Sequence, residues 1–258
     1  MSLTGLVLGA MALLAGCSAA SEEAGDTATG AGNGDATEFA LRTADGALGD
    51  MILGDPNAPV TLVEYASFTC SACANFHINV FPDLKEKYIN TGKVRLVLRE
   101  MPTGPQELSY IGSLLARCAA DTAGDDAYFL IADSLFRGQA NWAFGNDPKL
   151  ELLKIANQAG MDEAALNSCL RRQELVDLIN DNVKIATQDY KITGTPGFIL
   201  QNEKLKLQTF SELDEALANA YAKATGTPLE TDEKPQTQAP ALESAPAEHT
   251  EKETSGSE

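Results

Sequence analysis

The chain has 258 residues, of which 44% are hydrophobic and 22% charged, and its formal net charge is −18. This acidic balance excludes non-specific binding to nucleic acid or to an anionic membrane surface, because both need a basic footprint. The acidic excess is concentrated in two polar segments, residues 18–45 and 226–258. The intervening residues are numerous enough for one hydrophobic core with an inserted subdomain.

The first sixteen residues are small and apolar, too short a stretch to span a bilayer, and typical of a signal-peptide core. Their end, Leu14-Ala15-Gly16-Cys17, looks like a bacterial lipobox, so we expect a lipoprotein signal peptide over residues 1–16 and a lipid anchor on Cys17. Met1–Gly5 lacks the usual Lys or Arg, so either the true start lies upstream or the α-amino group supplies the positive charge. An uncleaved signal or a chance cysteine is the alternative to the lipobox. A lipidated protein works outside the cytoplasm, in the periplasm or cell envelope and anchored to a membrane, where disulfides persist.

Two segments are predicted to stay unfolded. Residues 17–45 are mostly Gly, Ala, Ser, Thr and acidic residues, the composition of a flexible linker. Residues 226–258 are rich in Pro, Glu, Thr and Ala and cannot bury enough apolar surface to fold, so we expect a disordered acidic tail.

The folded part begins with a strand. Val60–Tyr65 is β-rich and apolar on both faces, which favours a central, buried strand. A helical stretch follows from the Cys70–Cys73 segment to about Tyr88, and Lys93–Arg99 predicts a second strand that ends near Pro102.

The segment between Pro105 and Tyr190 has helical periodicity, with breaks at Gly124, Gly138–Asp147 and Gly160. Strands resume at Gly197–Leu200 and Lys204–Leu207, and an amphipathic helix is predicted over Ser211–Lys223 with Ser211 as its N-cap. This order predicts an α/β fold with an all-helical domain inserted into it.

Five cysteines divide into Cys17 and two pairs, which suggests disulfide chemistry in an exported protein. Cys70 and Cys73 lie where the buried strand gives way to a helix, and their i, i+3 spacing puts both sulfurs on one face of its first turn. At a helix N-terminus, unpaired N–H groups and the helix dipole stabilise a thiolate. Cys70 is therefore the predicted nucleophile and Cys73 the resolving thiol.

Three segments together resemble the DsbA-like thiol–disulfide oxidoreductases: Glu64–Cys73, Arg99–Pro102 and Gly194–Phe198. Those oxidoreductases are thioredoxin-fold proteins with an inserted helical domain. The resemblance covers about residues 48–224. It implies a thioredoxin-like domain formed by residues 46–103 and 190–225, and a helical insertion at residues 104–189.

The resemblance also implies roles for two residues that precede the later strand. Pro196 is expected to be cis and to pack opposite the disulfide, where Thr195 offers its backbone to the substrate and tunes the thiolate with its side chain. An ordinary strand-entry proline is the alternative, because only about 5–6% of X–Pro bonds in folded proteins are cis.

Glu64 interrupts an otherwise apolar strand six residues before Cys70. A carboxyl buried there is reluctant to ionise, and we expect it to relay a proton to or from Cys73; a solvated Glu near the strand end is the alternative. His77 lies one helical turn beyond Cys73, and we interpret it as a packing or surface residue rather than a catalytic one.

Cys118 and Cys169 fall on different predicted helices of the insertion. We expect them to form a structural disulfide like the second one that some relatives carry, contributing about 4 kcal/mol in the chain-entropy model. Two buried free thiols are the alternative.

The predicted function is thiol–disulfide exchange with exported proteins that carry free cysteines, mainly as an oxidase. Ser71-Ala72 departs from the pattern of strongly oxidising relatives, which carry a His between the cysteines, so a reductase or isomerase remains an alternative. We expect a monomer that needs no cofactor and is recycled by an unidentified membrane redox partner.

Two other classes of function compete with this one. In a metal-binding module, Cys70 and Cys73 would bind copper or zinc. Structural zinc needs four ligands, however, and the sequence has no second CxxC and only two histidines, His77 and His249. A lipoprotein that uses the fold only for binding would not need an intact pair of cysteines.

Overall fold

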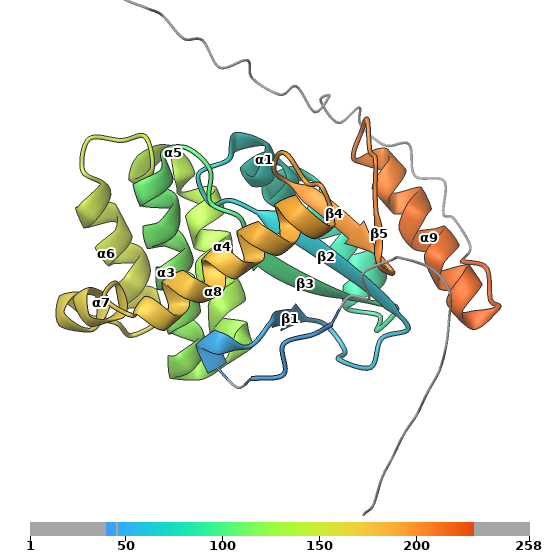
Figure 1. Ribbon diagram of the computed structural model, residues 1–258, viewed down its shortest axis with the longest axis horizontal. Coiled ribbons are helices and arrows are strands. Elements are labelled where there is room, and N and C mark those ends of the chain that lie inside the picture. The colour runs from blue at the N-terminus through green and yellow to red at the C-terminus, as the bar shows by residue number, and fades with distance from the viewer. Residues whose placement is uncertain (1–39, 45, 230–258) are drawn as a thin grey trace, which may run out of the picture. The chain divides into compact units, whose positions relative to one another are not determined.

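The computed structural model describes residues 40–44 and 46–229 (Figure 1). Within them the strands form one sheet in the order β1-β3-β2-β4-β5. The strands are β1 (Met51–Leu53), β2 (Val60–Ala66), β3 (Val94–Glu100), β4 (Gly197–Leu200) and β5 (Glu203–Lys204). β2 and β3 are parallel, and every other neighbouring pair is antiparallel.

Most of the helices lie between β3 and β4 in the sequence. They are α3 (Gln106–Ala123), α4 (Asp125–Arg137), α5 (Gln139–Trp142), α6 (Pro148–Gln158), α7 (Glu163–Cys169) and α8 (Gln173–Lys184), which continues into the π-helical turn η3 (Ile185–Asp189). The others are the short 3₁₀ turn η1 (Gly46–Leu48), α1 (Ser71–Asn79), α2 (Phe81–Leu84), the π-helical turn η2 (Lys85–Ile89) and α9 (Ser211–Thr225). The prediction of an α/β fold with an inserted helical region is therefore confirmed.

The central strand β2 is buried along its whole length, because strands flank it on both sides and helices cover both faces. Val60 and Leu62 pack in a cluster with side chains of α1 and α9. Val63 and Tyr65 point the other way and pack against the end of α8 and η3. The unbroken apolar run in the sequence follows from this burial on both faces.

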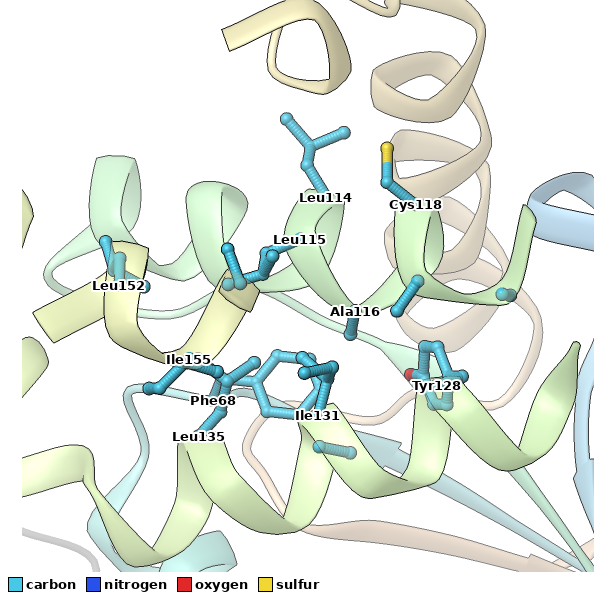
Figure 2. Packing of buried hydrophobic residues seen from close by; sticks show 14 of the residues in the cluster. Phe68, Leu114, Leu115, Ala116, Cys118, Tyr128, Ile131, Leu135, Leu152 and Ile155 are labelled. Atoms are coloured by element: carbon cyan, nitrogen blue, oxygen red, sulfur yellow. The ribbon is translucent and has the colours of Figure 1, made fainter. Parts of the chain in front are cut away.

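The loop that leaves β2 is embedded in the core of the helical insertion. Phe68 lies in the same cluster as Ile131, Leu135 and Ile155 (Figure 2), and its ring centroid is 4.9 Å from that of Phe136. A side chain only two residues before Cys70 thus anchors the first cysteine to the insertion.

A fully buried ion pair joins the insertion to the sheet. Arg117 of α3 donates from Nε and Nη2 to the two carboxylate oxygens of Glu100, at 2.8 and 2.7 Å, and neither side chain is exposed. Nη1 of Arg117 also donates to the carbonyls of Ala47 and Gly49 at 2.7 and 2.8 Å. The hydroxyl of Tyr128 donates to Glu100 at 2.8 Å. The pair therefore fixes the end of β3, two helices and the segment before β1 to one another.

The ends of the fold differ from the sequence-based expectation in three places. β1 was not predicted, and the last strand is Glu203–Lys204 rather than Lys204–Leu207. Ser211 as N-cap is wrong: α9 starts at Ser211 itself, and the Ser211 hydroxyl is hydrogen-bonded to that of Thr209 at 2.7 Å instead of capping the helix. The Ser211 hydroxyl, on the first residue of the helix, is thus directed to Thr209 before the helix and not to a backbone N–H of the first turn.

The predicted signal peptide over residues 1–16, lipidation of Cys17, most of the linker and most of the acidic tail lie outside the described residues. Within the part that is described, no helix has both the length and the apolar character needed to cross a bilayer. The boundaries proposed for the two domains remain predictions.

Candidate functional site

Cys70 and Cys73 are both free thiols, at the junction between the loop after β2 and α1. Cys70 is the N-cap of α1 and is partly exposed, whereas Cys73 lies in the first turn and is completely buried. The chain turns into the helix through a hydrogen bond from the Cys70 amide to the Ser67 carbonyl, at 3.1 Å. The fold thus presents one sulfur to solvent and keeps the other beneath it.

The Cys70 thiol is acidified by its surroundings, which lower its pKa to about 6. The largest cause is a hydrogen bond from the Cys73 thiol, which stabilises the thiolate and outweighs the opposing effect of burial. The Thr195 side chain and the backbone N–H groups of Cys73 and Ala72 stabilise it further. A cysteine with such a pKa is largely a thiolate at neutral pH, and the thiolate is the nucleophilic form.

Cys73 has the opposite character, because burial raises the pKa of its thiol well above the usual value. Its hydrogen bond to Cys70 and the negative charge of Glu64 add to this effect. The two thiols therefore differ in acidity: the Cys70 thiol loses its proton readily, and the buried Cys73 thiol retains its proton.

Thr195 and Pro196 lie against the exposed sulfur. The peptide bond between them is cis, and the Thr195 carbonyl oxygen accepts a hydrogen bond of 3.2 Å from Cys70 Sγ in its thiol form. This bond favours the thiol, while the Thr195 side chain favours the thiolate. Residues 125 positions apart in sequence therefore meet at one sulfur.

Gln139 holds the loop that carries Cys70, a contact that the sequence did not predict. Its side-chain amide donates to the carbonyls of Phe68 and Cys70, at 2.8 and 3.0 Å. Gln139 comes from α5 of the insertion and is buried. Gln139 has no motif around it and lies 69 positions after Cys70, so the sequence gives no indication of this role.

A cluster of hydroxyl groups lies under the same loop. Ser67 Oγ is within 2.8 Å of both Ser109 Oγ and Thr103 Oγ1, and within 3.1 Å of Thr69 Oγ1. Ser67, Thr69 and Ser109 are buried. Together these bonds join the loop after β2 to the segment after β3 and to α3, and so restrict how far the loop that carries Cys70 can move.

Glu64 is completely buried in β2, where it lies opposite Leu98 and Phe198 of the neighbouring strands. Nε2 of His77 lies 3.1 and 3.0 Å from its two carboxylate oxygens. His77 is itself only 7% exposed, and its ring stacks on that of Phe136 with the centroids 4.1 Å apart. The packing expected for His77 is therefore present, together with a bond to Glu64 that was not foreseen.

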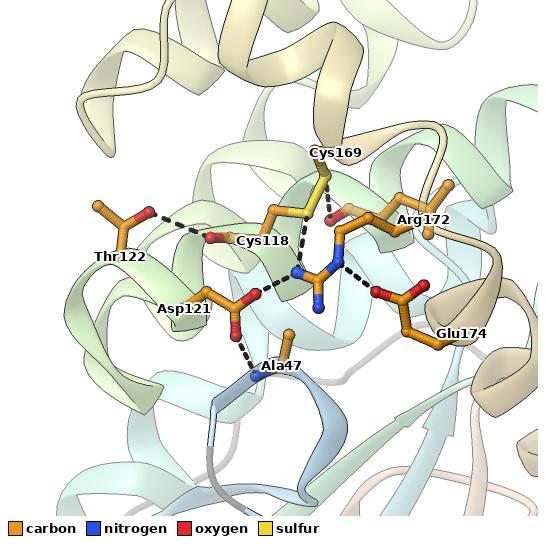
Figure 3. Close-up of a disulfide and its surroundings, with 8 residues drawn as sticks. Ala47, Cys118, Asp121, Thr122, Cys169, Arg172 and Glu174 are labelled. Carbon is orange, nitrogen blue, oxygen red and sulfur yellow. Dashed lines mark hydrogen bonds and ion pairs between the residues drawn. A yellow bond between two sulfur atoms is a disulfide. The ribbon is translucent and has the colours of Figure 1, made fainter.

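Cys118 and Cys169 are joined by a disulfide that links α3 to α7, with Cα atoms 6.1 Å apart. Arg172 lies beside it and forms ion pairs with Asp121 and Glu174 (Figure 3). Asp121 also accepts a hydrogen bond of 2.7 Å from the amide of Ala47. This disulfide and its ion pairs belong to the framework of the insertion, separate from the Cys70–Cys73 pair.

A hollow of about 290 Å³ is lined by Thr61, Val63, Arg95, Gln201 and Asn202, at the end of β2 away from Cys70. Among the described residues there is no group of three or more His, Cys, Asp or Glu side chains arranged to hold a metal ion. The Cys70–Cys73 pair is therefore the candidate site.

The electrostatics of Cys70 predict its reactivity towards alkylating agents. The rate of Cys70 alkylation by iodoacetamide should rise with pH through a midpoint of about 6, because only the thiolate reacts. Thr195→Val should raise that midpoint by about one to two pH units, the value of one hydrogen bond to a charged group. Mass spectrometry of the alkylated peptide measures both rates. A midpoint that stays near that of an ordinary cysteine, about 8.5, would contradict the prediction.

Comparison with known proteins gives a consistent result. A family model described as thioredoxin matches residues 47–219. A protein of Rickettsia bellii that carries the name protein-disulfide oxidoreductase is 30% identical over 171 residues, which are 66% of this chain and 64% of that protein. A Bacillus anthracis protein named for disulfide bond formation (protein D) is 27% identical over 167 residues, covering 64% of this chain and 75% of the relative. The present chain thus spans somewhat less than two thirds of the rickettsial relative.

Solved structures agree with these sequence matches. The crystal structure of Wolbachia pipientis alpha-DsbA1 is 29% identical and superposes with a TM-score of 0.59, covering 68% of this chain and 92% of that one. The oxidised form of BdbD from Bacillus subtilis, at 20% identity, has the same fold with a TM-score of 0.58, covering 67% of this chain and 92% of that one. The resemblance inferred from the sequence is confirmed by these matches.

Proposed function

Because this chain belongs to the thioredoxin family, we propose that it is a protein thiol–disulfide oxidoreductase whose redox centre is Cys70 and Cys73. The observation that carries the proposal is the contrast between the two thiols. One is partly exposed with a pKa of about 6, and the other is buried directly beside it with a raised pKa. The names of the relatives, which refer to disulfide oxidoreduction and disulfide bond formation, support the same activity.

The reaction is a sequence of two thiol–disulfide exchanges. In the oxidised protein, a substrate thiolate attacks Cys70 Sγ, the Cys70–Cys73 bond breaks, and Cys73 leaves as a thiolate that takes up a proton. A second substrate thiolate then attacks the substrate sulfur bound to Cys70, and Cys70 leaves as a thiolate. The substrate loses two electrons and gains a disulfide, while the protein gains those two electrons as its dithiol form.

Two neighbours of the cysteines have roles in this proposal. The carbonyl of Thr195, 3.2 Å from Cys70 Sγ, is placed where the backbone of a substrate would align beside the sulfur, with Pro196 packed behind it. Glu64 is the proton carrier for Cys73, because its charge raises the pKa of that thiol and the surrounding strand excludes water.

We propose that the reaction runs in the direction that oxidises the substrate. A stabilised Cys70 thiolate stabilises the dithiol form, and this makes the disulfide a stronger oxidant. The pKa of Cys70, about 6, lies between the values of about 7 for thioredoxin and about 3.5 for DsbA. The alternative is a reductase or isomerase that uses the same residues with electrons flowing in the opposite direction.

The reduction potential of the Cys70–Cys73 pair decides between these directions. Equilibration of a soluble form, starting after Cys17, with glutathione buffers should give a value well above the figure for thioredoxin, about −270 mV, and towards the figure for DsbA, about −120 mV. A value at or below about −270 mV would overturn the oxidase assignment and favour the reductase. The Cys70→Ser variant, which has no redox pair, is the control for the Cys118–Cys169 disulfide.

The setting of the reaction is also part of the proposal. We place the protein in the periplasm or cell envelope, held to a membrane by a lipid on Cys17, on the basis of the Leu14–Cys17 sequence. Exported proteins with free cysteines would be its substrates. A membrane protein that accepts electrons from Cys70 and Cys73 would restore the disulfide.

A further inference from the structure

The buried bond between His77 and Glu64 has no role in the exchange chemistry described so far. Both side chains lie in the apolar space between β2 and α1, with exposed fractions of 7% and 0%. An ionised carboxylate in such surroundings is strongly destabilised unless it is paired and hydrogen-bonded. His77 supplies that partner through Nε2, 3.0 Å from Oε2 of Glu64.

The two side chains are held in fixed positions. Phe136 of α4 stacks on the His77 ring, with an interplanar angle of 11°. Phe76 and Phe81 approach the same ring from α1 and α2, with centroids 5.3 and 5.1 Å away. Aromatic rings thus surround the imidazole, and Glu64 is its polar contact in the direction of the sheet.

The other titratable groups near this pair are few. Cys73 lies on the same helix one turn before His77, and it senses the charge of Glu64. The Tyr128 hydroxyl of α4 also senses Glu64, but it is committed to Glu100 by a hydrogen bond of 2.8 Å. Among these groups, Cys73 is the one whose protonation changes in each exchange.

We propose that His77 is a positioning residue for Glu64, and that the two side chains together hold the proton that Cys73 gains and loses during exchange. This inference rests on the proposed function. The contact of 3.0 Å between Nε2 of His77 and Oε2 of Glu64 lets a proton move between the two groups. The pair therefore offers a second place for the proton, where Glu64 alone would offer one.

The proton transfer balances in both directions. When Cys73 attacks a mixed disulfide at Cys70, its thiol proton passes to the pair formed by the Glu64 carboxylate and the neutral His77 imidazole, and the pair becomes a carboxylate with an imidazolium. The Cys70–Cys73 bond then forms and the bound partner leaves as a thiolate. In the oxidising direction Cys73 leaves as a thiolate, and the imidazolium of the pair returns the proton through Glu64.

The test is the rate at which Cys73 resolves a mixed disulfide between Cys70 and glutathione, measured by rapid mixing across a range of pH. His77→Gln keeps an N–H donor for Glu64 but cannot bind a proton near neutral pH. We expect this variant to lose one ionisation from the pH profile and to react about 100-fold more slowly at neutral pH, a typical contribution of general acid–base catalysis. An unchanged profile would show that His77 is only a packing residue.

A double variant separates a positioning role from a structural one. If His77 acts through Glu64, His77→Gln should have little further effect on the rate in a Glu64→Gln background, because the two changes remove one function. Rate losses that multiply would overturn the inference. Failure of the unsubstituted protein to resolve the mixed disulfide would instead contradict the proposed function itself.

A measurement on the unsubstituted protein covers the case in which the variants fail to fold. The chain has 2 histidines, His77 and His249, so nuclear magnetic resonance can follow each imidazole separately, with His249 as internal reference. The protonation midpoint of His77 should coincide with the additional ionisation in the rate profile. An imidazole that titrates elsewhere would overturn the inference.

Discussion

Replacing Cys73 with serine should convert a transient mixed disulfide into a stable one. In this variant the Cys70 thiolate still forms, because its N-terminal position in α1 and its Thr195 contact remain and serine keeps an O–H donor in place of the Cys73 thiol. It should attack oxidised glutathione and retain one glutathione per chain, because no second thiol is present to displace it. Intact-protein mass spectrometry measures this adduct, and turnover with a reduced protein substrate should fall to the uncatalysed rate.

The matched control is Cys70→Ser, which leaves the buried cysteine. Cys73 is completely buried and its raised pKa keeps it a thiol, so this variant should form no adduct under the same conditions and should also lack turnover. The Cys118–Cys169 disulfide is present in both variants and accounts for any background reaction. An adduct on Cys73 but none on Cys70 would reverse the roles assigned to the two cysteines.

Replacing Arg117 with leucine should cost about 3–5 kcal/mol of unfolding free energy, the usual cost of leaving one partner of a buried pair uncompensated. The carboxylate of Glu100 would keep only the Tyr128 hydroxyl and the Asn182 amide, at 2.8 and 3.1 Å. The carbonyls of Ala47 and Gly49 would lose their donor as well. Denaturant unfolding with the Cys118–Cys169 disulfide intact measures the loss.

Arg137 provides the control for this substitution. Its ion pair with Asp133 lies on the surface of α4, with 52% and 51% of the two side chains exposed. Arg137→Leu should therefore change stability by no more than about 0.5 kcal/mol. Removing both partners, with Arg117→Leu and Glu100→Leu, should recover part of the loss. A loss below about 1 kcal/mol for Arg117→Leu alone would show that solvent reaches the pair after the substitution.

The sequence predicted those parts of the site that depend on local pattern. Val60–Tyr65 is apolar on both faces because β2 is the central strand of the sheet, so its burial could be inferred without knowing its neighbours. The position of Cys70 at a helix N-terminus followed from the change of periodicity just after that strand. Glu64 differs from its neighbours as the one charged residue in this run.

Contacts across the fold could not be inferred in the same way. Gln139 contacts the Cys70 loop only because α5 packs beside it, and one glutamine in a helical segment has no distinguishing pattern. The pairing of His77 with Glu64 depends on how α1 is rotated above the sheet, which helical periodicity alone does not specify. β1 is three residues long and its place depends on pairing with β3, so its sequence carries too little alternation to predict it.

The hydrogen bonds of Gln139 have a consequence for how such a protein can arise or be re-engineered. The carbonyls of Phe68 and Cys70 obtain their side-chain donor from the inserted helices, and the Phe68 ring is buried among them. Transplanting the four residues from Cys70 to Cys73 into another scaffold would carry the sulfurs without the groups that shape their backbone. The insertion and the cysteine loop therefore have to be exchanged together. Recombination that replaced either part alone would separate Cys70 from the inserted side chains that hold its loop.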